Sequence, residues 1–385
     1  MKTNLKKLLY SGVTLMSLGV LAACSSTSSS TTTSSSAATS QTSVATTSNN
    51  STSSDSSSSS IDWSALPTTE VTLSNDGLKI TEGGTYILTG STTAGVTVET
   101  DANVRIILAG AEISSSDTAA INVINADNVE LEIKDGTTNT VKDSSNHTDT
   151  NIEGAIHVEA DLTITGNGSL TVEGNFQDGI VSTDDLVIDA GNITVTAVDD
   201  GIRGKDSLTI NGGTITVTAG GDGIKSTNDT DTTKGYTTIT GGEITVKAGD
   251  DGIKAETALT IDGGTITVSE SAEALEGTNI TINGGTIDVY GSDDAINASS
   301  TTSSDIYIKV TGGDLKVAVG SGDTDAFDAN GDIYISGGTI AVTAPTSAFD
   351  FDGTAELTGG TVTVNGEQIT QITATGPGAG GHGGW

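Results

Sequence analysis

The sequence is poor in the residues that build a wide globular core. Of its 385 residues only 3 are Pro and 3% are aromatic, whereas 50 are Gly. The shortage of large apolar side chains excludes a thick core, and much Gly with little Pro is typical of regular coils joined by tight turns. The single Cys, Cys24, excludes an internal disulfide framework.

Basic residues are also scarce. The chain has 15 Lys and Arg against 50 Asp and Glu, for a formal net charge of −35. A surface of this charge repels nucleic acid and anionic membranes and attracts cations, so we expect no nucleic-acid partner. The three His residues are dispersed and lack the spacing of a metal site.

The first 24 residues have the organisation of an export signal. Three lysines within residues 2–7 precede an apolar stretch, residues 8–20, that is too short for a comfortable membrane span. Leu21-Ala22-Ala23-Cys24 then resembles the lipobox of bacterial lipoproteins, which implies cleavage after residue 23 and acylation of Cys24. The alternative is an ordinary signal peptide with an incidental Cys. Removal of residues 1–23 takes away three lysines and no acids, which changes the net charge from −35 to −38.

Composition divides the rest of the chain into three parts. Residues 24–60 are almost entirely Ser, Thr and Ala and are expected to form a flexible stalk. Residues 61–375 carry short β-branched segments bounded by Gly, Asn or Asp, such as 85–88, 96–98, 104–108 and 129–133, which predict strands. Residues 376–385 form a Gly-rich tail that we expect to be flexible.

A repeat runs through residues 178–349. The triplet Asp-Gly-Ile begins at Asp178, Asp200 and Asp222, every 22 residues, and again at Asp251 after 29, with an insertion within residues 226–236. Related triplets continue the register from Glu273, Asp294, Asp325 and Ser347. Between the triplets lies a second phrase, Leu-Thr-Ile-Asn/Asp-Gly-Gly-Thr-Ile-Thr-Val, clearest at residues 208–217 and 259–268.

Three short strands and three turns in about 22 residues predict one coil of a three-sided β-solenoid. We therefore expect an all-β fold, a parallel β-helix, with a right-handed wind as the rule for parallel connections. Alternation along the strands places apolar side chains inward, stacked on their equivalents in the next coil, and threonines outward. The expected inward set is Ile202, Leu208, Ile210, Ile215 and Val217, and the expected outward set is Thr209, Thr214 and Thr216.

A family resemblance is carried by residues 84–90, 103–110 and 125–136 and by the Asp-Asp-Gly-Ile repeats. In these segments the chain resembles the carbohydrate-binding parallel β-helix family of clostridia and related bacteria. The resemblance covers residues 62–375 in the family's order. It implies a right-handed β-helix akin to pectate lyases, calcium in the turns, and binding of cellulose or of an acidic polysaccharide such as polygalacturonate.

The aspartates of the triplets are candidate metal ligands. Equivalent residues in adjacent coils lie about 4.8 Å apart, and like charges at that distance repel unless a cation intervenes. Ca²⁺ suits carboxylates and turn carbonyls. The alternative is that Asp-Gly only forms a tight turn, but that does not explain the doubled aspartates. The candidate ligands are Asp199, Asp200, Asp222, Asp250, Asp251, Asp293 and Asp294.

A second acidic cluster lies nearer the C-terminus. Asp323, Asp325 and Asp328 fall in one coil, and Asp350 is expected to stack on Asp328. The spacing differs from that of an EF-hand loop. These four aspartates are further candidate calcium ligands, and the alternative is a solvated acidic turn.

The third feature is a basic column. Arg203, Lys225 and Lys254 each follow a triplet by one residue, and the column continues as Glu276, Asn297, Asp328 and Asp350. These cations are candidates to bind uronate carboxylates. In the pectate lyases that the fold resembles, an Arg or Lys removes a proton next to the carboxyl group, so one of the three is also a candidate base. The alternative, which we favour over the base, is that they neutralise neighbouring aspartates.

The sequence therefore predicts a monomeric, lipid-anchored protein on the extracellular face of the membrane that binds polysaccharide through calcium. Aromatic residues for stacking on neutral sugars are few, so an acidic glycan is favoured over cellulose. Two alternatives remain: a calcium-dependent polysaccharide lyase, and a structural or adhesive surface protein. Whether the chain is an enzyme stays open, with binding favoured. Outward threonine arrays also occur in ice-binding proteins, but Thr is a good exposed strand residue in any case.

Overall fold

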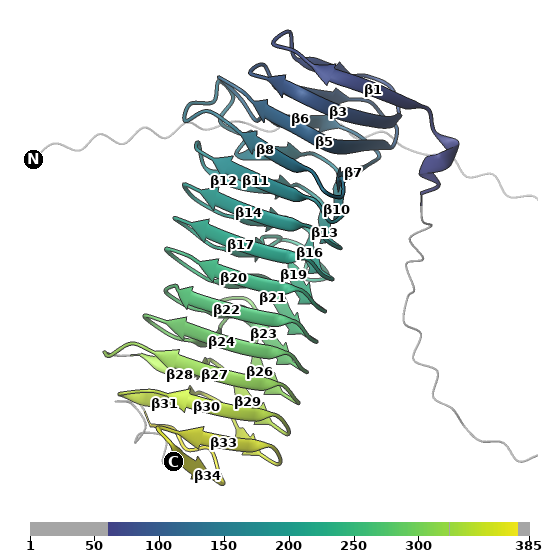
Figure 1. Ribbon diagram of the computed structural model, residues 1–385. Coiled ribbons are helices and arrows are strands. Elements are labelled where there is room, and N and C mark those ends of the chain that lie inside the picture. Colours follow the sequence, from purple (N-terminus) through teal and green to yellow (C-terminus); the bar gives the residue numbers. More distant parts are fainter. Residues whose placement is uncertain (1–60, 323, 376–385) are drawn as a thin grey trace, which may run out of the picture. The chain divides into compact units, whose positions relative to one another are not determined.

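The computed structural model describes residues 61–322 and 324–375, which form 34 strands and one short 3-10 turn, Trp63–Ala65 (Figure 1). The strands belong to one sheet, in which every pairing is parallel except that of the last two strands. Within these residues no helix has the length and hydropathy to cross a membrane. The expected signal segment, Cys24, the stalk, Asp323 and the tail lie outside the described residues.

Three parallel ladders run along the stack, and a typical coil contributes one strand, or part of a longer strand, to each ladder. In one coil these strands are β15 (Ile202–Gly204), β16 (Ser207–Ile210) and β17 (Thr214–Ala219). They pair in order with β18 (Ile224–Ser226), β19 (Tyr236–Ile239) and β20 (Glu243–Lys247) of the next coil. The expected three-sided parallel β-helix with a 22-residue coil is confirmed. We call these the first, second and third ladders.

The first ladder otherwise contains β2 (Leu78–Ile80), β4 (Val96–Glu99), β6 (Ile121–Asn125), β9 (Gly154–Val158), β12 (Asp178–Ser182), the first parts of β21 (Ile253–Ile261) and β23 (Leu275–Ile282), β25 (Ile296–Ala298), β28 (Asp325–Ala329) and β31 (Ser347–Phe351). The second contains β1 (Thr68–Leu73), β3 (Gly84–Thr92), β5 (Val104–Ser114), β7 (Asn128–Ile133), β10 (Asp161–Thr165), β13 (Asp185–Ile188), the second parts of β21 and β23, β26 (Tyr307–Val310), β29 (Asp332–Ile335) and β32 (Ala355–Leu357). The third begins with the ends of β3 and β5 and continues through β8 (Thr138–Lys142), β11 (Ser169–Gly174), β14 (Asn192–Ala197), β22 (Thr265–Glu270), β24 (Thr286–Gly291), β27 (Asp314–Val319), β30 (Thr339–Thr343), β33 (Thr361–Val364) and the antiparallel β34 (Glu367–Ile369).

The core is a narrow column of stacked aliphatic side chains. All five side chains expected to face inward are buried, whereas Thr214 and Thr216 are exposed and Thr209 is half-buried. Near the C-terminal end the column becomes aromatic, where Phe327 and Phe349 stack with ring centroids 5.2 Å apart. Because each coil buries little surface alone, its stability depends on the coils on either side.

The Gly-Gly pairs form the turn between the second and third ladders. The second glycine of each pair, such as Gly213, Gly242 and Gly264, has φ between +92° and +94°. Residues with a Cβ seldom adopt this conformation. The repeated glycines therefore hold one turn geometry in successive coils.

Candidate functional site

Buried aspartates line the turn that leads into the first ladder. Asp178, Asp200, Asp222 and Asp251 are each less than 7% exposed. The Oδ1 atoms of the first three, Asp178, Asp200 and Asp222, each accept a hydrogen bond from the backbone N–H of the next aspartate in the column, at 3.1, 2.9 and 2.9 Å. A buried N–H must have a partner, so these carboxylates have a structural role in the turn. These bonds support the alternative that the aspartates serve to form the turn. Their role as metal ligands stays a prediction.

The basic column lies beside these aspartates in the expected register, Arg203 next to Lys225 and Lys225 next to Lys254. The Lys225 Nζ bridges the Oδ2 atoms of Asp200 and Asp222, at 2.5 and 3.0 Å. The other two cations make similar bridges. Arg203 pairs with Asp178 (2.8 Å) and Glu153, and Lys254 pairs with Asp251 (2.7 Å) and Glu276. Each cation therefore neutralises carboxylates of neighbouring coils.

These ion pairs set the protonation of the column. Burial alone would lower the pKa of Lys225, but Asp222 and Asp200 raise it overall. The pKa values of Arg203 and Lys254 are raised for the same reason. Burial raises the pKa of Asp178 to about 6, against the opposing effect of Arg203. The three basic groups are held in their charged forms, which is unsuitable for a base that removes a proton.

Beyond Lys254 the same column becomes acidic. Glu276, Asn297, Asp328 and Asp350 follow one another in register, as the sequence predicts. Among residues 61–322 and 324–375, no Lys or Arg forms an ion pair with Asp328 or Asp350. Burial and the neighbouring carboxylates, Asp294 foremost, raise the pKa of Asp328 to about 7. We call the two columns together, from Asp178 to Asp350, the charged edge.

Two glutamates on the charged edge are absent from the ligand set expected from the sequence. Burial and the neighbouring Asp251 raise the pKa values of Glu273 and Glu276 to about 8. The spacing of the repeat could have identified both glutamates. Glu273 takes the triplet position of Asp251, and Glu276 takes the position of Lys254 in the next coil. The replacement of Lys by Glu marks the coil at which the charged edge loses its cations.

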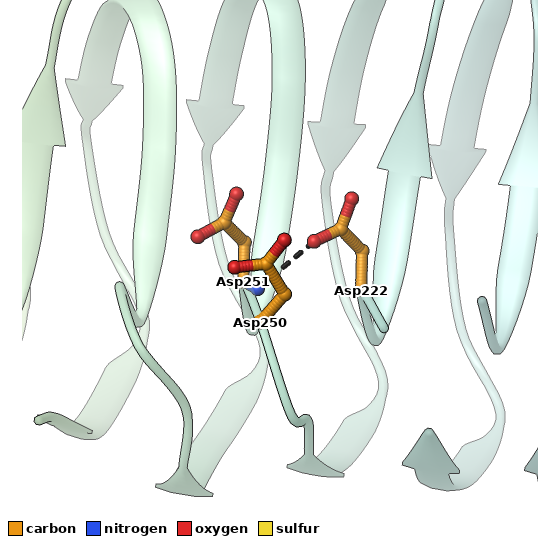
Figure 2. Close-up of side chains that lie close together, drawn as sticks. All are labelled: Asp222, Asp250 and Asp251. Atoms are coloured by element: carbon orange, nitrogen blue, oxygen red, sulfur yellow. Dashed lines mark hydrogen bonds between the residues drawn. The ribbon is translucent and has the colours of Figure 1, made fainter. Parts of the chain in front are cut away.

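Within the described part of the chain, Asp222, Asp250 and Asp251 form a compact group of three carboxylates (Figure 2). One oxygen of each lies within 4.8 Å of the others. Asp250 is exposed, and the other two are buried. Among the described residues, the buried Oδ1 of Asp251 has no hydrogen-bond partner. Carboxylate oxygens are the donors that Ca²⁺ prefers, so these residues fit such an ion.

The remaining candidates are spread along the charged edge. Asp199 and Asp293 are exposed, and among the described residues they join no comparable group of three. Asp325 continues the turn ladder, because its N–H donates to the Oδ1 of Asp294 at 2.7 Å. Asp323 lies outside the described residues.

Comparisons with known proteins agree with this architecture. A solved structure titled "polysaccharide lyase-like protein from C. thermocellum, Gadolinium derivative" shares 33% sequence identity and superposes with a TM-score of 0.52. The match covers 54% of this chain and 92% of that one.

A carbohydrate-binding domain-containing protein of Acetivibrio thermocellus is 33% identical over 135 residues, which are 33% of this chain and 47% of the relative. The chain thus spans about half the length of the curated relative it matches. A family model described as carbohydrate-binding domain-containing protein matches residues 74–326. The chain therefore belongs to the family of carbohydrate-binding domain-containing proteins.

Proposed function

We propose that the protein binds an acidic polysaccharide through calcium ions held on the charged edge. The observation that carries the proposal is the change along one column, from carboxylates bridged by Arg203, Lys225 and Lys254 to the acidic positions Asp328 and Asp350. The raised pKa of Asp328 expresses the cost of burying a carboxylate and, next to that, of placing other carboxylates beside it without a compensating charge. A divalent cation removes that cost.

Calcium explains how an acidic protein attracts an acidic polymer. With a net charge of −35, the chain repels a polyuronate directly. An ion shared between protein and sugar carboxylates converts the repulsion into a contact. The grouping of Asp222, Asp250 and Asp251 favours a hard cation.

Lyase activity is the second candidate, because the structural neighbour is titled a polysaccharide lyase-like protein. The candidate bases Arg203, Lys225 and Lys254 are each bridged between carboxylates, and their pKa values are raised. We therefore favour binding without cleavage. Incubation with polygalacturonate and calcium tests this, and a rise in ultraviolet absorbance from unsaturated uronate would establish the lyase instead.

We further propose that acylated Cys24 and the Ser/Thr-rich stalk hold this domain on the extracellular face of the membrane. In that position the charged edge is available to extracellular glycan. Release of the protein from membranes by a Cys24→Ala substitution tests the anchor.

The central experiment measures binding of the full chain to polygalacturonate in calcium and in EDTA. We expect binding only in calcium. The double substitution Asp328→Asn with Asp350→Asn should weaken it, whereas Asp314→Asn, an exposed carboxylate on β27 away from the charged edge, should not. Equal binding in EDTA would contradict the proposal. If a glycan array in calcium shows no binding at all, a structural or adhesive role becomes the better explanation.

A further inference from the structure

Two insertions interrupt the coils at the corner between the first and second ladders. One, residues 227–235, joins β18 to β19, and the other, residues 299–306, joins β25 to β26. In the two coils between them, β21 and β23 run through the same corner as continuous strands. The insertions are three coil steps apart, about 14 Å at the usual strand spacing, so they wall a trough whose floor is β21 and β23.

The first wall is held by the buried Asp206. Its Oδ1 accepts from the Asn228 Nδ2 at 2.6 Å, and its Oδ2 pairs with Lys234. The Asn228 Oδ1 in turn accepts the backbone N–H groups of Thr230 and Asp231, at 3.2 and 3.0 Å. These bonds fix both ends of the inserted loop on the coil below it.

The second wall is held by its own hydroxyl groups. The Ser300 Oγ accepts the backbone N–H groups of Thr302 and Ser303, at 3.2 and 3.1 Å. The Ser303 Oγ accepts that of Asp305 at 3.1 Å. Because internal hydrogen bonds already order both loops, they lose little conformational entropy when a ligand binds between them.

The trough contains two adjoining hollows of about 420 and 320 Å³. Both are lined by Glu256, Thr278 and Ser300, so they form one groove. Tyr236 lines the larger hollow and is 38% exposed. The neighbouring position in the next coil is the small Ala258, since Thr237 pairs with Leu259. An exposed aromatic ring beside hydroxyl and amide groups is the combination that binds the apolar face and the hydroxyls of a sugar.

The charged side chains that line the groove bear on whether it binds a charged or an uncharged sugar. Its larger hollow is lined by the acidic Asp229, Asp231 and Glu256 and, as far as the described residues go, by no Lys or Arg. Lys254 lines only the smaller hollow, where it pairs with Asp251 and Glu276. Among the described residues the three carboxylates of the larger hollow do not form a group close enough to hold a metal ion, unlike Asp222, Asp250 and Asp251. The lining therefore repels uronates and suits uncharged sugars.

We infer that the groove between the insertions at 227–235 and 299–306 is a second glycan site, which binds uncharged polysaccharide without calcium and uses Tyr236 as its stacking platform. The inference rests on the proposed polysaccharide binding. The smaller hollow borders the charged edge at Lys254 and Glu276, whereas the larger hollow, which holds Tyr236, shares no lining residue with that edge. The two sites differ in ligand charge and in their need for calcium.

Titration of the full chain with uncharged hexasaccharides of glucan, mannan, xylan and chitin, in EDTA and in calcium, tests the inference. At least one should bind equally in both. Loss of the ring in Tyr236→Ala should weaken that binding about tenfold, whereas Tyr236→Phe should retain it. The matched control is Tyr290→Ala, because Tyr290 is also 38% exposed but lies on β24 in the third ladder.

Three outcomes would overturn the inference: no uncharged hexasaccharide binds, binding is lost in EDTA, or Tyr236→Ala and Tyr290→Ala bind alike. Polygalacturonate in calcium, measured on the same samples, separates the two proposals. If it binds while the uncharged sugars do not, the groove fails and the charged edge stands. If the uncharged sugars bind and it does not, the charged edge fails.

Discussion

Asp222 makes two structural interactions with one carboxylate. Its Oδ1 accepts the Asp251 N–H at 2.9 Å, and its Oδ2 lies 3.0 Å from the Lys225 Nζ. Asp222→Ala leaves a buried N–H without a partner, so we expect a loss of about 2–3 kcal/mol in the free energy of unfolding. Asp222→Asn keeps an acceptor and should cost about 1 kcal/mol. Urea denaturation measures both, and a loss no greater than that of the exposed control Asp314→Ala would refute the argument.

Asp328 should make stability fall as the pH rises. Its pKa is raised from 3.8 to about 7, so the folded protein holds this proton more tightly than the unfolded chain. The resulting stability is fully present below about pH 4 and is lost as the pH rises to about 7. In calcium-free buffer, Asp328→Asn should therefore raise the Tm at pH 8, by roughly 2 °C for a screened, half-buried group, and leave it unchanged at pH 4. Thermal melts followed by circular dichroism measure this, and an equal shift at both pH values would contradict it.

At the scale of the structural element, the Gly-Gly turns give each coil its bend. Gly242 has φ +93°, and a Cβ placed there would lie 3.0 Å from the Gly213 carbonyl oxygen. Gly136 also has a positive φ, +72°, but a Cβ there meets nothing within 4 Å. We expect Gly242→Ala to lower the free energy of unfolding by about 1–3 kcal/mol, and more than Gly136→Ala. Urea midpoints of the two variants compare them, and equal losses would show that backbone conformation alone sets the cost.

At the scale of the whole molecule, the excess of acid should make stability depend on calcium. An ion that binds only the folded state stabilises it by about 2.7 kcal/mol at one hundred times its Kd. We expect calcium to raise the Tm and EDTA to reverse the change. Magnesium should do less, because it demands octahedral geometry and retains its waters. NaCl at matched ionic strength controls for screening, and an equal rise in NaCl would remove the case for a specific site.

The parallel repeat ends at the C-terminal end of the stack. After β33 the chain reverses into the antiparallel β34, and the Thr375 Oγ1 accepts the Ala348 N–H at 2.9 Å. These contacts cover part of the last coil, whose open strands would otherwise be available for pairing. The degenerate triplet Ser347-Ala348-Phe349 indicates the end of the repeat, but nothing in it predicts the direction of the returning strand.

The coil, the three ladders and the alternation of buried and outward residues follow from the amino-acid sequence alone, because one period repeats and successive strand residues face opposite sides. The sequence also sets which charges share a column, since register follows from the spacing of the triplets. The side-chain partners, in contrast, depend on the folded chain. Three features depend on side-chain directions and loop paths. Lys225 bridges two coils, Asp222 accepts the N–H of Asp251, and two insertions enclose a groove beside Tyr236. The packing of neighbouring coils sets these, and no local pattern encodes them.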